Sequence, residues 1–266
     1  MTRQETGTAG GRFDVTMLSM GVGEVPGPEV RWMRDFDRWH TLQFQVALVQ
    51  GRGTVALVNT GPPEDLTELN SGWAGFLGER AALQRRDGEF LLDQLERVGV
   101  DPAAVTDIVL TPLQLYTVGN VMAFPNATIH ISRRGWVHFH TTHDHPHDDR
   151  ETSIPGALLS YLVGPAWNRV RLLDDEDTVA PGLRTWWCGG HHRASVVVEV
   201  DTDRGTVAIS DSYFLADNVT ENHPIGISEN IYESLDAYRR VREAGHIVVP
   251  LYDPRNFERF PGGVIS

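Results

Sequence analysis

The feature that most constrains the fold of this chain is a series of short apolar runs, each stopped by turn residues. Residues 55–58 (VALV) lead directly into Asn-Thr-Gly-Pro-Pro at 59–63, and residues 108–111 (IVLT) lead into a proline. Runs of four to eight apolar residues bounded by Gly and Pro are typical of buried strands. These segments therefore predict short buried strands that end in tight turns.

The rest of the chain alternates between strand patterns and helix patterns. Apolar residues recur at helical spacing near 88–98 and 228–243. Strands are expected at 13–17, 42–48, 127–132 and 247–249, and within 170–210, where a hairpin turns at 202–205. Two strand-rich halves that each carry helices predict two packed sheets with helices outside. We expect one domain over residues 1–266, with residues 1–12 as a flexible N-terminus.

The composition excludes several classes of protein. The 266 residues are 41% hydrophobic, carry a net charge of -13 and include one cysteine, Cys188, which we expect to be a small buried residue. The negative charge opposes nucleic-acid binding, and no apolar run approaches the roughly 18–20 residues of a membrane helix. The polar N-terminus lacks the apolar core of a signal peptide. We therefore expect a cytoplasmic protein without nucleic-acid or membrane partners.

The chain contains no lysine, and all 23 of its basic residues are arginine. Schiff-base catalysis and a lysine general base are therefore excluded. Arginine stays protonated in proteins, so its roles here are to bind anions or to pair with carboxylates.

Several motifs occur in a fixed order along the chain. They are Asn-Thr-Gly at 59–61, TDIVLTPLQLYTVGN at 106–120, Phe-Pro-Asn-Ala at 124–127, Gly-His at 190–191, Ser-Asp at 210–211 and PLYDP at 250–254. In this order they resemble the metallo-β-lactamase superfamily, and within it the N-acyl homoserine lactonase-like branch, over roughly residues 13–260. The resemblance implies an α/β (α+β) fold, the four-layer αβ/βα sandwich.

The resemblance also identifies where this chain differs from the family. The family binds two metal ions, usually zinc, through a Thr-His-x-His-x-Asp-His loop, a later Gly-His, an Asp after a strand and a His near the C-terminus. His191 and Asp211 keep their family identities, whereas the other ligand positions hold Pro112, Gln114, Tyr116, Thr117 and Tyr252. We expect no cofactor; the alternative is one divalent metal such as zinc, held by Gln114, His191 and Asp211.

The polar residues at these positions are the candidate site. We expect acid–base catalysis from His191, His192, Asp211, Tyr116 and Tyr252. The candidate substrate-binding residues are Gln114, Thr117, Asn59, Tyr213, Phe214 and Arg193. Because an unpaired buried charge is costly, we expect the Asp211 carboxylate to be held by His191, Tyr116 or Tyr252.

The resemblance predicts that separate segments form one cleft, the main polar pocket. They are residues 59–63, 112–120, 189–193, 211–214 and 250–254. Trp32, Trp39 and Trp73 lie in loops expected at its rim, which favours an aromatic wall. The His-rich stretch 138–149 lacks regular ligand spacing, so we expect an exposed or lid loop there.

Three functions remain open from the sequence. The first is a hydrolase-like enzyme that acts on a lactone, ester or related carbonyl metabolite through acid–base residues. The second is a hydrolase with a single weakly held metal. The third is a non-catalytic ligand-binding protein of the same fold. All three have a small-molecule partner, and a homodimer is possible under each.

Overall fold

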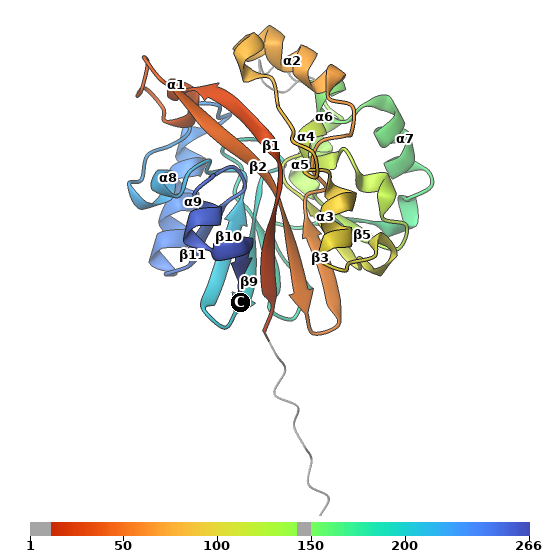
Figure 1. The fold of residues 1–266 in the computed structure, drawn as a ribbon. Helices are drawn as coiled ribbons and strands as arrows, with labels where there is room; N and C mark the ends of the chain where they lie inside the picture. The colour runs from red at the N-terminus through yellow and green to blue at the C-terminus, as the bar shows by residue number, and fades with distance from the viewer. Residues whose placement is uncertain (1–11, 143–149) are drawn as a thin grey trace, which may run out of the picture.

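A computed structural model describes residues 12–142 and 150–266 as two sheets packed face to face, with helices on both outer sides (Figure 1). Of the segment predicted to be a flexible N-terminus, residues 1–11 lie outside the described residues. Residues 143–149 of the His-rich stretch lie outside them too. The predicted four-layer sandwich is confirmed.

The first sheet has seven strands in the order β12-β1-β2-β3-β4-β5-β6. β1, β2 and β3 pair antiparallel, and β3 to β6 pair parallel. The parallel strands all end at the same edge, which gathers their following loops there. The strands are β1 (Asp14–Pro26), β2 (Trp39–Gly51), β3 (Thr54–Val58), β4 (Asp107–Leu110), β5 (Thr128–Ser132), β6 (Val170–Leu173) and β12 (Val264–Ile265).

The second sheet has five strands in the order β11-β10-β9-β8-β7. The parallel pair β10 and β11 ends next to Asp211 and Leu251, at the same edge of the sheet. The strands are β7 (Glu176–Ala180), β8 (Leu183–Trp187), β9 (Val196–Thr202), β10 (Gly205–Ser210) and β11 (Ile247–Pro250).

The helices form the two outer layers (Figure 1). α3 (Leu91–Arg97), α4 (Leu115–Val118), α5 (Arg133–Phe139), α6 (Arg150–Ser153) and α7 (Gly156–Val163) lie on the side of the seven-stranded sheet. α8 (Ala216–Thr220) and α9 (Ile231–Glu243) lie beside the five-stranded sheet. The remaining helices are α1 (Gly27–Val30), α2 (Thr67–Leu77), which lies above the strand ends, and α10 (Asn256–Arg259).

The core lies between the sheets and follows from the strand sequences. Aliphatic side chains of β4 and β9, such as Ile108, Val196 and Val198, are completely or almost completely buried. Branched aliphatic residues pack well on a pleated sheet, so these short runs form central strands. A second apolar cluster, centred on Tyr213 and Tyr238, lies between the five-stranded sheet and α9.

The predicted elements are present, with shifted boundaries. The strand expected at 13–17 extends to Pro26, because β1 pairs with β2 along nearly its whole length. The helix expected near 228–243 begins at Ile231, where the Asn230 side chain accepts hydrogen bonds from the amides of Tyr232 and Glu233. Within the described ranges, no helix combines the length and apolar character needed to cross a membrane.

Candidate functional site

A cavity of about 760 Å³ lies at the edge where the strand ends meet, with α2 as one wall. Apart from α2, its lining comes from β1 and β2, from the segments that follow β3, β4, β10 and β11, and from the loops before β9 and α9. The lining residues are Val25, Leu42, Phe44, Asp65, Thr67, Glu68, Ser71, Gly72, Trp73, Phe76, Leu77, Gln114, Tyr116, His191, His192, Phe214, Ile227 and Tyr252.

Four of the five segments predicted to form one cleft contribute to this lining. The segment 59–63 does not contribute. The Asn59 side chain is bonded instead to the backbone of Thr111. Its Oδ1 accepts from the Thr111 amide and its Nδ2 donates to the Thr111 carbonyl, each at 2.7 Å. Asn59 therefore fixes the loop that leads to Gln114 and Tyr116, and its side chain lies off the cavity wall.

An aromatic cluster forms much of the wall, so the cavity is less polar than predicted. Phe44 contacts Trp73, Tyr116 and Tyr252 at ring-centroid distances of 5.2, 5.5 and 5.1 Å. Phe214 continues the cluster, 5.1 Å from Tyr252. Of the three tryptophans expected at the rim, Trp73 lines the cavity, whereas Trp32 and Trp39 do not.

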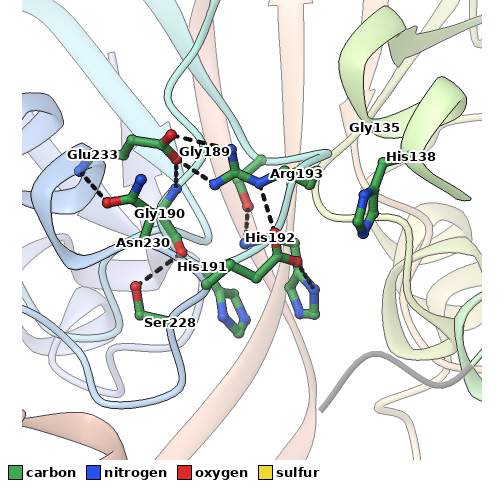
Figure 2. Close-up of polar contacts among 12 residues, drawn as sticks. Gly135, His138, Gly189, Gly190, His191, His192, Arg193, Ser228, Asn230 and Glu233 are labelled. Atoms are coloured by element: carbon green, nitrogen blue, oxygen red, sulfur yellow. Dashed lines mark hydrogen bonds and ion pairs between the residues drawn. The ribbon is translucent and has the colours of Figure 1, made fainter. Parts of the chain in front are cut away.

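The two cavity histidines follow a tight turn at Gly189 and Gly190. Both glycines have positive φ angles, 57° and 75°. A Cβ at Gly190 would come within 2.4 Å of Ser234 Oγ, so α9 packs directly on this turn. The Gly190 carbonyl accepts hydrogen bonds from Ser228 Oγ and the Glu229 amide, both at 2.8 Å. Figure 2 shows the turn held between α9 and its preceding loop.

His192 is paired with a buried carboxylate that sequence reasoning missed. Its Nδ1 lies 3.7 Å from Oε1 of Glu229, whose side chain is 2% exposed. Arg193 Nε donates to the other Glu229 oxygen at 2.6 Å, and its guanidinium also pairs with Glu233 (Figure 2). Burial alone would raise the Glu229 pKa, but His192 and Arg193 together lower it to about 2. Glu229 is therefore a charged carboxylate at neutral pH.

His191 is held by a neutral group instead. Its Nδ1 lies 2.7 Å from the Ile227 carbonyl oxygen. A carbonyl accepts only an N–H, which places the proton on Nδ1. The His191 ring is tilted by 57° against that of His192, with centroids 4.1 Å apart, and it lies edge-on against Phe214 at 5.0 Å.

Asp211 has other partners than those predicted. Its two carboxylate oxygens accept from the hydroxyls of Thr111 and Ser195, and not from His191, Tyr116 or Tyr252. The expected partners are wrong because Asp211 lies at the end of β10 beneath the Ser195 turn, away from the cavity wall. Burial raises the pKa of this carboxyl, although both hydroxyls oppose that shift. Ser195 Oγ also accepts from the His192 amide at 3.1 Å, so Asp211 supports the histidine loop.

Tyr252 carries a buried hydroxyl with no hydrogen-bond partner among the described residues. The side chain is 3% exposed and lines the cavity. Its backbone is fixed by β2, because the Gln43 amide donates to the Tyr252 carbonyl at 2.9 Å. Burial and the neighbouring Tyr116 raise the Tyr252 pKa, so its hydroxyl stays a proton donor.

The other candidate residues divide into two groups. Gln114 and Phe214 line the cavity. Thr117, Tyr213 and Arg193 do not, because their polar groups hold the scaffold. The Thr117 hydroxyl donates to the Pro112 carbonyl at 2.6 Å, and the Tyr213 hydroxyl donates to the Ala208 carbonyl at 2.9 Å.

Cys188 is buried as expected. Its pKa is raised by burial, which makes it a poor nucleophile.

No protein-family model and no curated protein matches this sequence. Solved structures do match. The fold is that of the metallo-β-lactamase superfamily. An N-acyl homoserine lactone hydrolase, with N-hexanoyl-L-homoserine bound at its catalytic metal centre, superposes with a TM-score of 0.77 over 94% of this chain and 98% of that chain, at 17% identity.

Two further structures agree. A dizinc quorum-quenching lactonase superposes with a TM-score of 0.66 at 15% identity, over 96% of this chain and 90% of that chain. A hydrolase of the beta lactamase superfamily superposes with a TM-score of 0.63 at 14% identity, over 96% of this chain and 89% of that chain.

The comparisons correct the prediction that the protein uses no cofactor. That prediction is wrong, because the lactonase structures of this fold hold metal at the catalytic centre. The donor set of this chain nevertheless does not fit such a centre. Across residues 12–142 and 150–266, no three His, Cys, Asp or Glu side chains cluster as metal ligands. Of the three residues of the single-metal alternative, Gln114 and His191 line the cavity and Asp211 does not. No reaction step is therefore assigned to a metal.

Glu229 had no recognisable signal in the sequence. It is 36 positions from Arg193, and it sits immediately before the cap of α9, where a solvated acidic residue is the ordinary expectation.

Proposed function

We propose that the protein is a hydrolase of a lactone, an ester or a related carbonyl compound, with His192 as the general base. The observation that carries the proposal is the charged Glu229 carboxylate beside His192 Nδ1. A carboxylate beside Nδ1 favours the tautomer that carries its proton there, so that Nε2 is the nitrogen that accepts one, and it stabilises the resulting imidazolium. At 3.7 Å this is a charge contact longer than a hydrogen bond, and catalytic hydrogen bonds often tighten only when the substrate binds.

His192 is favoured over His191 by its partner. Both rings line the cavity, and both have Nδ1 directed at an oxygen. The Ile227 carbonyl is neutral and offers His191 only orientation, whereas Glu229 carries a full charge. An imidazolium is stabilised more by a nearby carboxylate than by a carbonyl dipole. His191 then orients the substrate or the attacking water.

The reaction proceeds through a tetrahedral intermediate. His192 Nε2 takes a proton from water as the water oxygen bonds to the substrate carbonyl carbon, and the carbonyl electron pair moves onto its oxygen. The unpartnered Tyr252 hydroxyl donates to that oxygen, with support from Tyr116. When the intermediate collapses, the carbon–oxygen bond to the leaving group breaks, and the departing oxygen takes the proton back from His192.

The experiment is a turnover screen of lactones and aryl esters with wild type, His192→Ala and a matched control. His246→Ala is the control, because His246 Nδ1 also lies 3.7 Å from a glutamate oxygen, that of Glu199, but off the cavity lining. We expect His192→Ala to lower kcat by about 10²- to 10⁴-fold and His246→Ala to leave it unchanged. Equal activity of both variants overturns the proposal. Saturable binding without turnover favours a non-catalytic binding protein.

A further inference from the structure

We propose that the ligand of this cavity carries an organic cation, an amine or a quaternary ammonium, whose charged group lies against the aromatic cluster of Phe44, Trp73, Tyr116, Phe214 and Tyr252. The inference deepens the proposed function and rests on it only for the carbonyl half of the ligand. The cation-binding part of the inference depends only on the residues of the cavity wall.

The aromatic cluster presents the kind of surface that binds cations. Its five side chains all line the cavity, and neighbouring rings lie 5.1 to 6.2 Å apart. Their interplanar angles range from 36° to 88°, so the rings face several directions instead of stacking. Rings set at such angles can present more than one π face to a bound group, and a cation within about 6 Å of a ring face is attracted by its quadrupole.

Among the described residues that line the cavity, two are carboxylates, and the basic side chains are those of the two histidines. Asp65 and Glu68, at the start of α2, line the cavity, and the lining drawn from residues 12–142 and 150–266 includes no arginine. The Asp65 carboxylate accepts from the Thr67 hydroxyl and amide, which lowers its pKa and keeps it charged. Arg85, on the far side of this loop, donates instead to the carbonyls of Pro62 and Pro63. The net charge of -13 adds long-range attraction for a cation.

The Tyr252 hydroxyl supplies an independent sign that a ligand belongs here. It is buried, it lines the cavity and it has no partner among the described residues. Leaving such a donor unpaired is unfavourable, and a ligand oxygen would remove that cost. The cavity therefore suits a molecule with an acceptor oxygen near Tyr252 and a positive group against the neighbouring rings.

A pair of isosteric probes tests the charge preference directly. Choline and 3,3-dimethylbutan-1-ol have nearly the same shape and differ in the positive charge. We expect wild type to bind choline about 3- to 30-fold more tightly, measured by calorimetry or tryptophan fluorescence. Trp73→Leu should abolish that preference and Trp73→Phe should retain part of it. Trp167→Leu, at a tryptophan that is 61% exposed and off the lining, should have no effect. Equal affinities, tighter binding of the alcohol or no binding of choline overturns the inference.

The acetate esters of the same two alcohols separate this inference from the proposed function. Faster hydrolysis of the choline ester, measured as kcat/KM, supports both. Equal hydrolysis of the two esters overturns the cation inference and leaves the hydrolase intact. Preferential choline binding with neither ester hydrolysed supports the cation site and counts against the hydrolase.

Discussion

Asp211 and Glu229 are both buried carboxylates bonded to the loop that carries the cavity histidines, but their partners give them opposite properties. Asp211 is held by two neutral hydroxyls, and burial raises its pKa. Glu229 lies between His192 and Arg193, which lower its pKa to about 2. The pKa of a buried carboxylate thus depends on how far its neighbours offset its burial, and a guanidinium with an imidazole offsets more than two hydroxyls do. Only Glu229 is placed and charged to stabilise an imidazolium.

The largest expected difference between the two carboxylates is in acid stability. The folded-state pKa of Glu229 lies below its unfolded value, so its contribution is present above about pH 4.5 and is lost as the pH falls toward 2. Between pH 5 and 2, wild type should lose on the order of 3 kcal/mol more unfolding free energy than Glu229→Gln. Urea unfolding of both proteins across this pH range measures the difference in unfolding free energy. Parallel pH profiles of the unfolding free energy for the two proteins would show that His192 and Arg193 do not lower the Glu229 pKa.

Activity should distinguish the two sites next. Glu229→Gln keeps a hydrogen-bond acceptor but removes the charge, so we expect kcat to fall by on the order of 10- to 100-fold with KM little changed. Asp211→Asn should change kcat by less than about threefold, because the hydrogen bonds of Asp211 reach the histidine loop through Ser195 and not through an imidazole. Steady-state kinetics on the ester found by the screen measures both. A larger loss in Asp211→Asn would reverse the assignment.

The smallest expected effect is that of Asp211→Asn on stability. Because the folded pKa of Asp211 is raised, its carboxyl contributes most stability below its unfolded pKa, and that contribution is lost as the pH rises through the folded value. The amide has no charge to bury, so Asp211→Asn should lie within about 1 kcal/mol of wild type at neutral pH, with a flatter pH profile.

Asp211→Ala is the matched comparison for that variant. It leaves the Thr111 and Ser195 hydroxyls without their acceptor and should cost about 1–3 kcal/mol. Equal losses in the alanine and asparagine variants would show that the charge matters.

The strand ends explain why much of the fold was predictable. Short apolar runs such as 55–58 and 108–111 carry a local signal, and the turn residues after them mark the edge where the cavity forms. The same motifs predicted that Tyr116, His191, His192 and Tyr252 lie together, and all four line the cavity.

Side-chain pairing was less accessible from the sequence. Glu229 meets His192 only because the loop before α9 folds over the Gly189–Gly190 turn, a contact between distant segments. The partners of Asp211 were missed for the same reason, since Thr111 lies 100 positions away. Asn59 was expected to face substrate, whereas its amide bridges two strand ends. Such contacts depend on the packing of whole elements and leave no periodicity in the sequence.

A double-mutant cycle of His192 and Glu229 tests the central claim most directly. If Glu229 acts through the imidazole, removing it has little further effect once His192 is absent. We therefore expect the kcat/KM of His192→Ala/Glu229→Gln to match that of His192→Ala within about twofold, although Glu229→Gln alone lowers it on the order of 10- to 100-fold. If the two losses multiply instead, the residues act independently, and the paired base described here is contradicted.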